Sequence, residues 1–312
     1  MASQVLPFQL PRDGRIYIEQ IIDRCTALIQ CGIWGDFHPS LLRTWMKNFT
    51  SDEERYFAAC VLDSLIYRSK SQTLGLIKQL FQRALPDLTR QKSTPLGHVQ
   101  DWERRLHLHP STADPGIRLV AAVKSTDPPG KSAQVIIRYM MQDLSIPRHW
   151  IINPWEMKSA ASAGVKMFIL VDDFLGTGDQ FEGTVLVEQL APLFMSNFVV
   201  YAPLTAHVEG IKHLRSRFRE LHISPVEILD ETYDLFHPDS AAFEDQVNTP
   251  ESAKTFYYEL LKNKGIDLSR PDRKGYGELG LAYAFEHATP DNSLPILWWR
   301  EAPWQPLFKH RV

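Results

Sequence analysis

Two adjacent acids, Asp172 and Asp173, close an apolar run that begins at Phe168, and a short stretch with two glycines, 176–178, follows them. Neighbouring carboxylates can accept hydrogen bonds from sugar hydroxyls. Glycines let the backbone curl so that its N–H groups converge on an anion, and the start of a helix adds partial positive charge. These residue types in this order predict a site for a sugar phosphate.

The elements that must position these groups are a strand and a helix. The run 167–171 is almost continuously apolar, which is typical of a parallel strand that is covered on both faces. A helix is expected to begin near Gln180. Open α/β sheets bind ligands at the carboxyl ends of their strands, so the acids are expected at the ligand-binding edge.

This arrangement resembles the phosphoribosyl-pyrophosphate loop of the type I phosphoribosyltransferases. Their pattern is an apolar strand, two acids, two variable residues, two threonines or near equivalents, a glycine, one more residue and a threonine. Here the two acids, Thr177 and Gly178 match the pattern, whereas Gly176 and Gln180 replace its first and last threonines. These replacements remove two hydroxyl donors and leave the backbone loop in place.

The resemblance implies a type I phosphoribosyltransferase-like fold and a role for each position of the loop. The acids hold the ribose hydroxyls during catalysis, and the loop amides and hydroxyls hold the 5′-phosphate. It also implies Mg²⁺ as cofactor, bridging pyrophosphate and ribose hydroxyls, and assigns no residue of the chain as a metal ligand. The expected catalytic residues are Asp172 and Asp173, and the expected phosphate-binding residues are Leu175, Gly176, Thr177, Gly178, Asp179 and Gln180.

Two blocks, 171–179 and 285–298, narrow the resemblance to a divergent branch of phosphoribosyltransferase-like proteins from bacterial conflict and defence loci. Some members of this branch lie beside retron reverse transcriptases. The resemblance implies an antiviral-defence effector that binds phosphoribosyl pyrophosphate or a nucleotide. It also implies a protein partner, for example a retron reverse transcriptase complex.

A second loop, 124–132, lies between an expected strand and an expected helix. In the phosphoribosyltransferase interpretation this loop contacts pyrophosphate through its amides and through Lys124, Ser125 or Lys131. A P-loop is the alternative, because 130–132 reads Gly-Lys-Ser, but Ser125 stands where that motif needs its first glycine. A proline-rich turn with an exposed lysine is a third interpretation.

A third polar block, 286–292, follows a late apolar run. His287, Thr289 and Asn292 are candidates for contact with the acceptor or the ribose, because functional residues concentrate on such loops. The competing interpretation is a connection whose polar side chains cap its own backbone.

Composition restricts the class of protein. The chain has 312 residues, 44 % of them hydrophobic and 23 % charged, with a net charge of −3, so bulk charge does not recruit nucleic acid. The basic residues of 212–219 are expected to form a solvated helix face, and direct contact with nucleic acid or phosphate is the alternative. Three cysteines without motif spacing, an N-terminus without an apolar core and the lack of a long apolar run predict a cytoplasmic protein that does not enter a membrane.

The expected organisation is a helical N-terminal region, 1–110, followed by a phosphoribosyltransferase-like α/β domain, 111–312. Helical periodicity and a capping box at Ser51 support helices over 12–90, and a polar stretch over 89–115 is expected to link them to the sheet. The N-terminal helices are expected to contact a protein partner or a second copy of the chain.

The expected activity is glycosyl transfer or cleavage at the ribosyl C1, and a catalytically silent nucleotide-binding module is the alternative. Strands are expected at 117–123, 165–171, 198–201, 226–229, 279–285 and 294–299, and later helices at 131–142, 181–190, 208–221 and from Thr249 onward.

Overall fold

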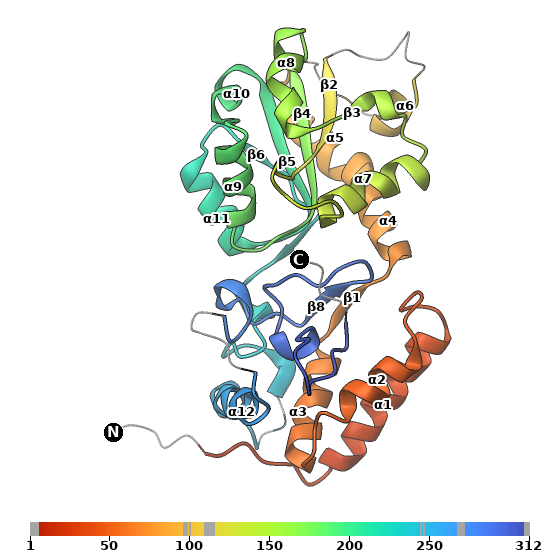
Figure 1. Ribbon diagram of the computed structural model, residues 1–312, viewed down its shortest axis with the longest axis vertical. Helices are drawn as coiled ribbons and strands as arrows, with labels where there is room; N and C mark the ends of the chain where they lie inside the picture. Colours follow the sequence, from red (N-terminus) through yellow and green to blue (C-terminus); the bar gives the residue numbers. More distant parts are fainter. Residues whose placement is uncertain are drawn as a thin grey trace. The chain divides into compact units, whose positions relative to one another are not determined.

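A computed structural model describes residues 6–95, 99, 101–108, 116–243, 245, 247–266 and 272–308 (Figure 1). The chain forms two compact units. Unit 1 is built from residues up to Ser71 and from Glu231 onward, and unit 2 is the continuous stretch Gln72–Asp230.

Unit 2 is organised around a parallel sheet in the order β3-β2-β4-β5-β6, with β7 also paired to β5. The two longest strands, β4 and β5, lie side by side at its centre. Their residues are almost all buried, as expected for strands covered on both faces. The strands are β2 Ile117–Ala121, β3 Ile151–Ile152, β4 Met167–Leu175, β5 Phe198–His207, β6 His222–Ile223 and β7 Glu227–Leu229.

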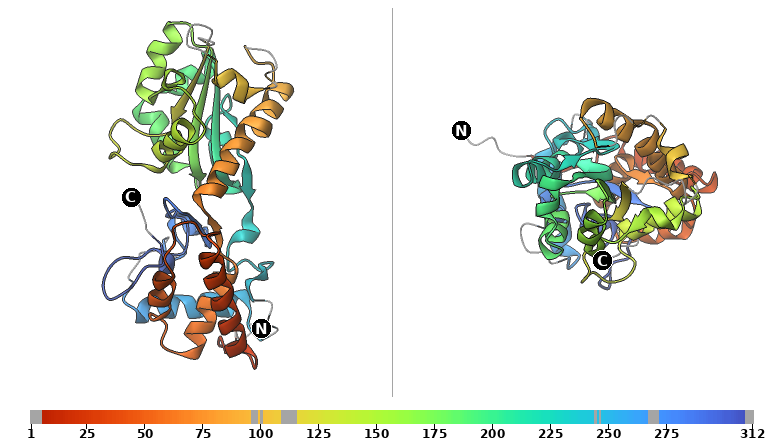
Figure 2. Two further views of the ribbon diagram at one scale, coloured as in Figure 1. Left: turned by 90° about the vertical axis from the view of Figure 1, so that its right-hand side faces the viewer. Right: turned by 90° about the horizontal axis from the view of Figure 1, so that it is seen from above.

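Helices cover both faces of this sheet (Figures 1 and 2). Along β4, Ile169 and Val171 pack with α4–α7, whereas Phe168 and Leu170 pack with α8–α11, because side chains alternate along a strand. This structure confirms the predicted α/β class with a parallel sheet flanked by helices. The helices are α4 Lys70–Gln79, extended by a π-helical turn Leu80–Ala84, then α5 Leu85–Gln91, α6 Trp102–Leu106, α7 Ser132–Gln142, α8 Met157–Ser162, α9 Asp179–Val187, α10 Ala191–Ser196 and α11 Val208–Arg217.

Unit 1 combines the first helices of the chain with its last segment. It contains α1 Gly14–Gln30, α2 Pro39–Met46, α3 Asp52–Asp63, α12 Pro250–Asn263 and a parallel pair of strands, β1 Ile66–Arg68 and β8 Tyr283–Phe285. Phe57 of α3 is fully buried and lies within 6.3 Å of the rings of Phe236, Phe243 and Tyr257. Each aromatic pair contributes about 0.5–1.5 kcal/mol beyond the burial of its area. An aromatic core therefore joins segments that are far apart in the sequence.

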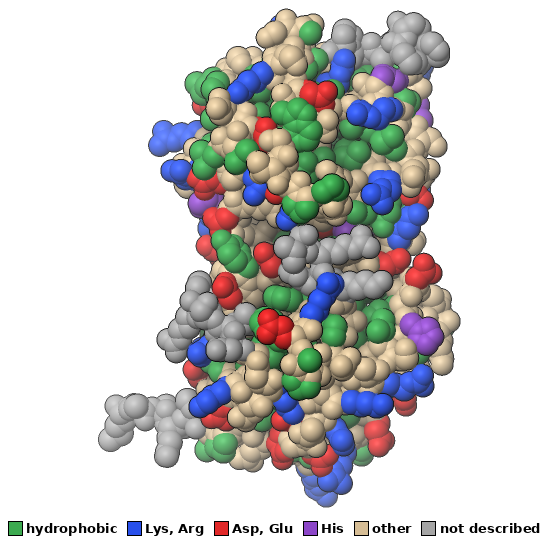
Figure 3. Space-filling model, in the orientation of Figure 1, with side chains coloured by type: hydrophobic (Ala, Val, Ile, Leu, Met, Phe, Trp, Pro, Cys, Tyr) green, Lys and Arg blue, Asp and Glu red, His purple; other side chains and the backbone are tan. Residues whose placement is uncertain are grey.

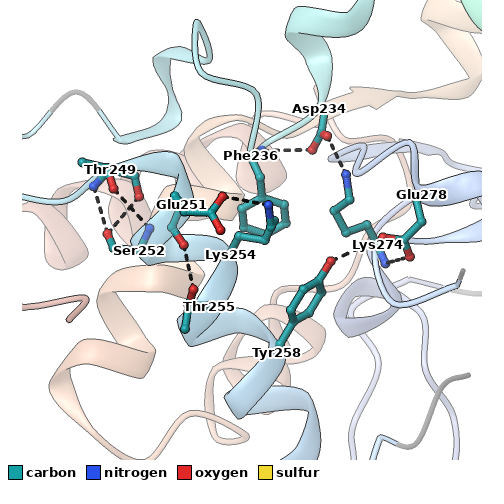
Figure 4. A network of polar contacts seen from close by, with 10 residues as sticks. All are labelled: Asp234, Phe236, Thr249, Glu251, Ser252, Lys254, Thr255, Tyr258, Lys274 and Glu278. Atoms are coloured by element: carbon teal, nitrogen blue, oxygen red, sulfur yellow. Dashed lines mark hydrogen bonds and ion pairs between the residues drawn. The ribbon is translucent and has the colours of Figure 1, made fainter. Parts of the chain in front are cut away.

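Polar contacts reinforce unit 1 where the late segment folds (Figure 4). Thr249 and Ser252 exchange side-chain to backbone hydrogen bonds that cap α12 at the expected start, with Pro250 in its first turn. The Lys274 ammonium forms an ion pair with Asp234 at 2.7 Å, and both side chains are largely shielded from solvent. The late segment is thus held by these polar contacts as well as by its aromatic core.

The boundary between the units differs from the expected division at residue 110. Helices α4–α6 pack on the sheet of unit 2, and the chain after Glu231 returns to the N-terminal helices. Contacts between segments so distant in the chain leave no local signal, which explains the difference. Residues 96–98, 100 and 109–115 of the expected linker lie outside the described residues.

Several smaller expectations are corrected. The stretch 294–299 is not a strand: Pro295–Leu297 is a 3-10 turn, because proline fixes φ and has no N–H to donate to a ladder. The late strand is confined to β8, at the end of the expected 279–285. Asp13 precedes α1 without a side-chain cap. The predicted capping box at Ser51 is confirmed in part: its hydroxyl accepts the Glu54 N–H at 3.1 Å, but the Glu54 carboxylate accepts the Thr50 N–H instead of the Ser51 N–H.

None of the described helices is both long enough and apolar enough to span a bilayer. On the face drawn in Figure 3, acidic and basic side chains are interspersed over the surface of each unit. Such mixing accords with the small net charge of −3.

Candidate functional site

Strand β4 carries both acids near its carboxyl end. It continues through them to Leu175, because β4 stays paired with β5 at Asp172↔Pro203 and Phe174↔Thr205. The expected strand end at residue 171 is therefore wrong by four residues. Asp172 is 2 % exposed and Asp173 is 5 % exposed, so both carboxyl groups lie inside the fold rather than on an outer surface.

The Asp172 carboxyl group has two polar neighbours. Its Oδ2 accepts the Tyr201 hydroxyl at 3.0 Å, and its Oδ1 accepts the Asp173 backbone N–H at 3.0 Å. Burial, followed by the charge of Asp173, raises the pKa of Asp172 well above its ordinary value, and the hydrogen bond from Tyr201 opposes that rise. The buried acid is thus poised to gain from hydroxyl donors that would stabilise its charged form.

Tyr201 lies on β5 and faces Asp172. Burial and the neighbouring Asp172 raise the pKa of its hydroxyl well above the usual range, so the tyrosine stays a donor. Its ring stacks on Phe181 of α9 with centroids 3.8 Å apart and planes inclined by 25°. Adjacent strand and helix residues thereby connect the acid to the helix that follows the glycine loop.

The glycine loop, 176–178, leads directly from β4 into α9. Gly178 occupies the N-cap position with φ +98°, a conformation that glycine adopts readily and β-branched residues do not. No side chain caps this end of α9, although the Thr177 hydroxyl donates to the Asp179 carboxylate at 2.7 Å. The predicted need for glycine at 178 is confirmed, and the helix begins at Asp179, close to the expected Gln180.

Helix α11 packs closely against this loop. A Cβ on Gly210 would collide with the carbonyl oxygen of Gly176, and a Cβ on Gly178 would lie 2.9 Å from the His213 ring. Glycine on both sides permits this close approach of loop and helix. The conformation of the loop is therefore set by packing against α11.

Part of the basic run on α11 is engaged inside unit 2. Glu182 of α9 accepts the His213 ring nitrogen at 2.6 Å and pairs with Arg217 at 2.7 Å. These two partners hold the pKa of Glu182 below its ordinary value. The expected solvated basic face is thus only partly correct, because two of its members hold α9 against α11.

One group of side chains near the loop has the composition of a metal site. Ligand atoms of Asp179, Glu182 and His213 lie within 4.8 Å of one another. Thr177 already donates to Asp179, and the Glu182 carboxylate already contacts the His213 ring nitrogen and forms an ion pair with Arg217. Hydrogen bonds and ion pairs therefore account for this group without an ion.

The loop after β2 is held by internal acids. The Asp127 carboxylate accepts the Lys124 N–H at 2.8 Å and lies 3.5 Å from its ammonium, while Glu188 accepts the Ser125 N–H at 2.6 Å. Within the part of the chain that the structure describes, Lys131 forms no ion pair. Two of the three expected pyrophosphate contacts are thus already partnered by carboxylates.

The late polar block belongs to unit 1, whereas the acids and both loops belong to unit 2. Asn292 is buried and donates its amide to the Tyr276 carbonyl at 2.8 Å, as expected for a side chain that fixes its own turn. Thr289 is 2 % exposed, and its hydroxyl has no hydrogen-bond partner among the described residues. His287 is buried with its ring centroid 5.0 Å from that of Phe285. The assignment of this block to an acceptor or a ribose stays a prediction.

Sequence patterns did not identify the partners of these groups. Tyr201 lies in an apolar strand pattern, and Glu188 ends a helix 63 residues from the Ser125 amide that it accepts. Glu182 and Gly210 were missed in the same way. One signal was available for Tyr201. A tyrosine in a buried strand places its hydroxyl inside the fold, and such a hydroxyl usually has a hydrogen-bond partner.

Comparison with known proteins agrees with this geometry. A search of curated proteins finds no match. A family model described as PRTase-CE matches residues 42–310, which is most of the 312-residue chain and includes the acidic strand, the glycine loop and the late polar block. The parallel α/β sheet flanked by helices is consistent with this match, and we conclude that the chain belongs to the PRTase-CE family and is phosphoribosyltransferase-like.

Proposed function

We propose that unit 2 binds phosphoribosyl pyrophosphate, or a nucleotide that shares its ribose 5-phosphate group, at the carboxyl edge of β4. One observation carries the proposal: a single strand holds a buried acid pair and leads straight into a glycine-opened helix with no side-chain cap. Asp172 and Asp173 would accept the ribose hydroxyls. The backbone of 175–180 would hold the 5′-phosphate, because N–H groups at a helix start attract anions.

The reaction that fits these groups is transfer or cleavage at the ribosyl C1. The bond from C1 to the pyrophosphate oxygen would break, with its electron pair leaving on pyrophosphate, and a bond from C1 to the acceptor would form as the acceptor loses a proton. The two acids would orient the ribose and offset the positive charge that develops on the ring. Lys131 and the amides of the β2 loop would neutralise the departing charge.

Mg²⁺ is the cofactor that this chemistry implies. The donor set fits, because the described neighbours with the largest effect on Asp172 are Asp173 and Tyr201, neither of them a cation, and Mg²⁺ prefers oxygen ligands such as carboxylates and phosphates. The cation would be held chiefly by pyrophosphate and ribose oxygens, and it would supply charge neutralisation for the leaving group.

A catalytically silent binding module is the second candidate. It is favoured by the β2 loop, where Asp127 forms an ion pair with Lys124 and Glu188 accepts a hydrogen bond from the Ser125 amide. It is also favoured by Gly176 and Gln180, which lack the hydroxyls of the family pattern. A module of this kind would bind ribose phosphates without releasing pyrophosphate.

One experiment separates the two candidates. The full chain is incubated with phosphoribosyl pyrophosphate, Mg²⁺ and a panel of bases and nucleotides, and pyrophosphate release is followed beside calorimetric binding. Release that disappears in Asp172→Asn with Asp173→Asn supports the enzyme. Binding without release supports the module, and the lack of both overturns the site.

We further propose that the N-terminal helices contact a protein partner or a second copy. The support is a set of apolar side chains left exposed on and beside α1 and α2, namely Ile16, Ile33 and Leu41 at 56 %, 48 % and 40 %. Deleting these helices would remove part of the core of unit 1, so surface substitution is the cleaner test. Ile16→Glu with Leu41→Glu should abolish an association that light scattering detects in the wild type, while Glu19→Gln, on the same helix, should not.

The proposed cellular role rests on the family resemblance. The resemblance to proteins of bacterial defence loci suggests a cytoplasmic antiviral effector, with a retron reverse transcriptase complex as one partner. The three cysteines are free, which is compatible with a reducing compartment. Co-purification of the tagged chain with a reverse transcriptase from its own locus would test the partner. Recovery of the chain alone under conditions that preserve such complexes would count against it.

A further inference from the structure

Tyr201 occupies a position that its burial alone does not explain. It is 1 % exposed and lies in β5, a strand whose residues are all buried. Its hydroxyl donates to Asp172 Oδ2 at 3.0 Å. A hydroxyl buried so deeply is costly unless it is paired, so the hydrogen bond to the acid is the feature that requires tyrosine here.

The ring of Tyr201 is fixed from the other side by α9. Phe181, the third residue of that helix and 1 % exposed, stacks on it with centroids 3.8 Å apart. Phe181 comes three residues after Gly178, so it is anchored to the same turn that would hold the 5′-phosphate. A continuous contact therefore runs from the glycine loop through Phe181 and Tyr201 to the Asp172 carboxyl group.

We propose that Tyr201 is a positioning residue for the proposed ribose 5-phosphate site, holding the Asp172 carboxyl group in place for the ribose hydroxyls and coupling it through Phe181 to the phosphate loop. This inference rests on the proposed function, and it adds a residue that does not itself touch the ligand. Tyr201 fixes one carboxylate oxygen, and the Asp173 N–H fixes the other, so the carboxyl plane cannot rotate freely.

The hydrogen bond also affects the charge of the acid. Among the described residues, the titratable groups with the largest effect on Asp172 are Asp173 on its own strand and Tyr201 on the neighbouring strand. Burial and Asp173 raise the pKa of Asp172, and the Tyr201 hydroxyl lowers it. Removing that hydroxyl should raise the pKa further, so binding that requires ionised Asp172 should move to higher pH.

The test is Tyr201→Phe in the full chain, with ribose 5-phosphate and inorganic phosphate as probes. Calorimetry from pH 5 to pH 9 should show that the variant binds ribose 5-phosphate about tenfold more weakly at neutral pH, as expected for loss of a hydrogen bond to a charged group. The midpoint of its pH profile should shift upward. Affinity for inorganic phosphate should stay within about twofold, because the loop amides are untouched.

Tyr257→Phe is the matched control, since Tyr257 is a fully buried tyrosine of unit 1 whose hydroxyl donates to a backbone carbonyl at 2.8 Å. It should leave both affinities and the pH midpoint unchanged. Phe181→Leu should reproduce part of the upward pH shift, because Tyr201 loses its stacking partner.

The outcomes distinguish the inference from the proposal beneath it. If the wild type does not bind ribose 5-phosphate, the proposed function fails. If the wild type binds and Tyr201→Phe shows the same affinity and the same pH midpoint, the positioning role is wrong. A variant that loses phosphate and ribose 5-phosphate binding in parallel, together with its thermal stability, would also overturn it, because the hydroxyl would then be structural support.

Discussion

The loops after β2 and β4 leave neighbouring parallel strands at the same edge of one sheet, yet they are held in different ways. The loop after β4 takes its shape from glycine and from packing against α11, and no side chain caps the helix that follows it. The loop after β2 takes its shape from two carboxylates. Asp127 forms an ion pair with Lys124, and Glu188 accepts a hydrogen bond from the Ser125 amide.

The difference concerns what a phosphate must displace. At the β4 loop an anion would meet a helix start with no side-chain cap. At the β2 loop an anion would have to displace the carboxylates of Asp127 and Glu188, which already accept hydrogen bonds from the backbone donors of this loop. We infer that the proposed 5′-phosphate subsite is preformed, whereas the proposed pyrophosphate subsite opens only when Asp127 and Glu188 release its donors.

The largest expected effect comes from removing the charge that both loops flank. Asp172→Asn with Asp173→Asn should weaken ribose 5-phosphate binding by about 100-fold or more, because hydrogen bonds to charged groups contribute about 1.5–3 kcal/mol each. Calorimetry measures this loss. Inorganic phosphate should still bind if the β4 loop is preformed, and parallel loss of both ligands would break the comparison.

The same double variant should keep or gain thermal stability. The pKa of Asp172 is raised in the folded chain, so its contribution to stability is present at low pH and is lost as the pH rises through the folded-state value. Asparagine does not titrate. The melting temperature of the variant, relative to wild type, should therefore increase with pH, and a large fall at neutral pH would make the acids structural.

The next effect tests whether packing shapes the β4 loop. Gly178→Val should abolish measurable phosphate binding and destabilise the fold by a few kcal/mol, because its positive φ and the His213 ring both exclude a branched side chain. Gly130→Val is the matched control, since Gly130 has φ +95° but no atom within 4 Å of an added Cβ. It should incur only backbone strain. Phosphate binding by Gly178→Val at wild-type affinity would show that this loop does not hold phosphate.

An effect of opposite sign would sharpen the comparison. Glu188→Ala removes the acceptor from the Ser125 amide, so pyrophosphate should bind up to about tenfold more tightly. Glu209→Ala is a suitable control, because Glu209 is an exposed acid paired with Lys212 at a helix surface. Titration with pyrophosphate decides the matter. Weaker binding in Glu188→Ala would mean that the carboxylate organises the loop rather than closing it.

The smallest effect concerns the remaining hydroxyl of the β4 loop. Thr177→Ala should weaken phosphate binding by only about two- to threefold, since the hydroxyl already donates to Asp179 and the amides do most of the holding. Ser216→Ala, which removes an exposed hydroxyl from α11, provides the comparison. A tenfold or larger loss in Thr177→Ala, measured by calorimetry, would instead assign the main role to the side chain.

The sequence predicted the sheet better than the contacts across it. The apolar runs at 117–123 and 167–171 correctly indicate buried strands, because parallel strands covered on both faces need little else. The extension of β4 to Leu175 depends on pairing with β5, which no local pattern reveals. The same holds for the Tyr201–Asp172 hydrogen bond and for the Glu188 carboxylate at the β2 loop. Gly178 was predictable, since a tight turn into a helix demands its positive φ.

The return of the chain to unit 1 at Glu231 has a consequence for synthesis on the ribosome. Helices α1–α3 emerge first, but the aromatic residues that complete their core are translated last. Tyr56 waits 189 residues for its hydrogen-bond partner Asp245, which is about 10–40 s at about 5–20 residues per second. Unit 2 is continuous and can fold during that interval. The nascent N-terminal helices therefore keep part of their apolar surface uncovered by unit 1 until the later segment arrives.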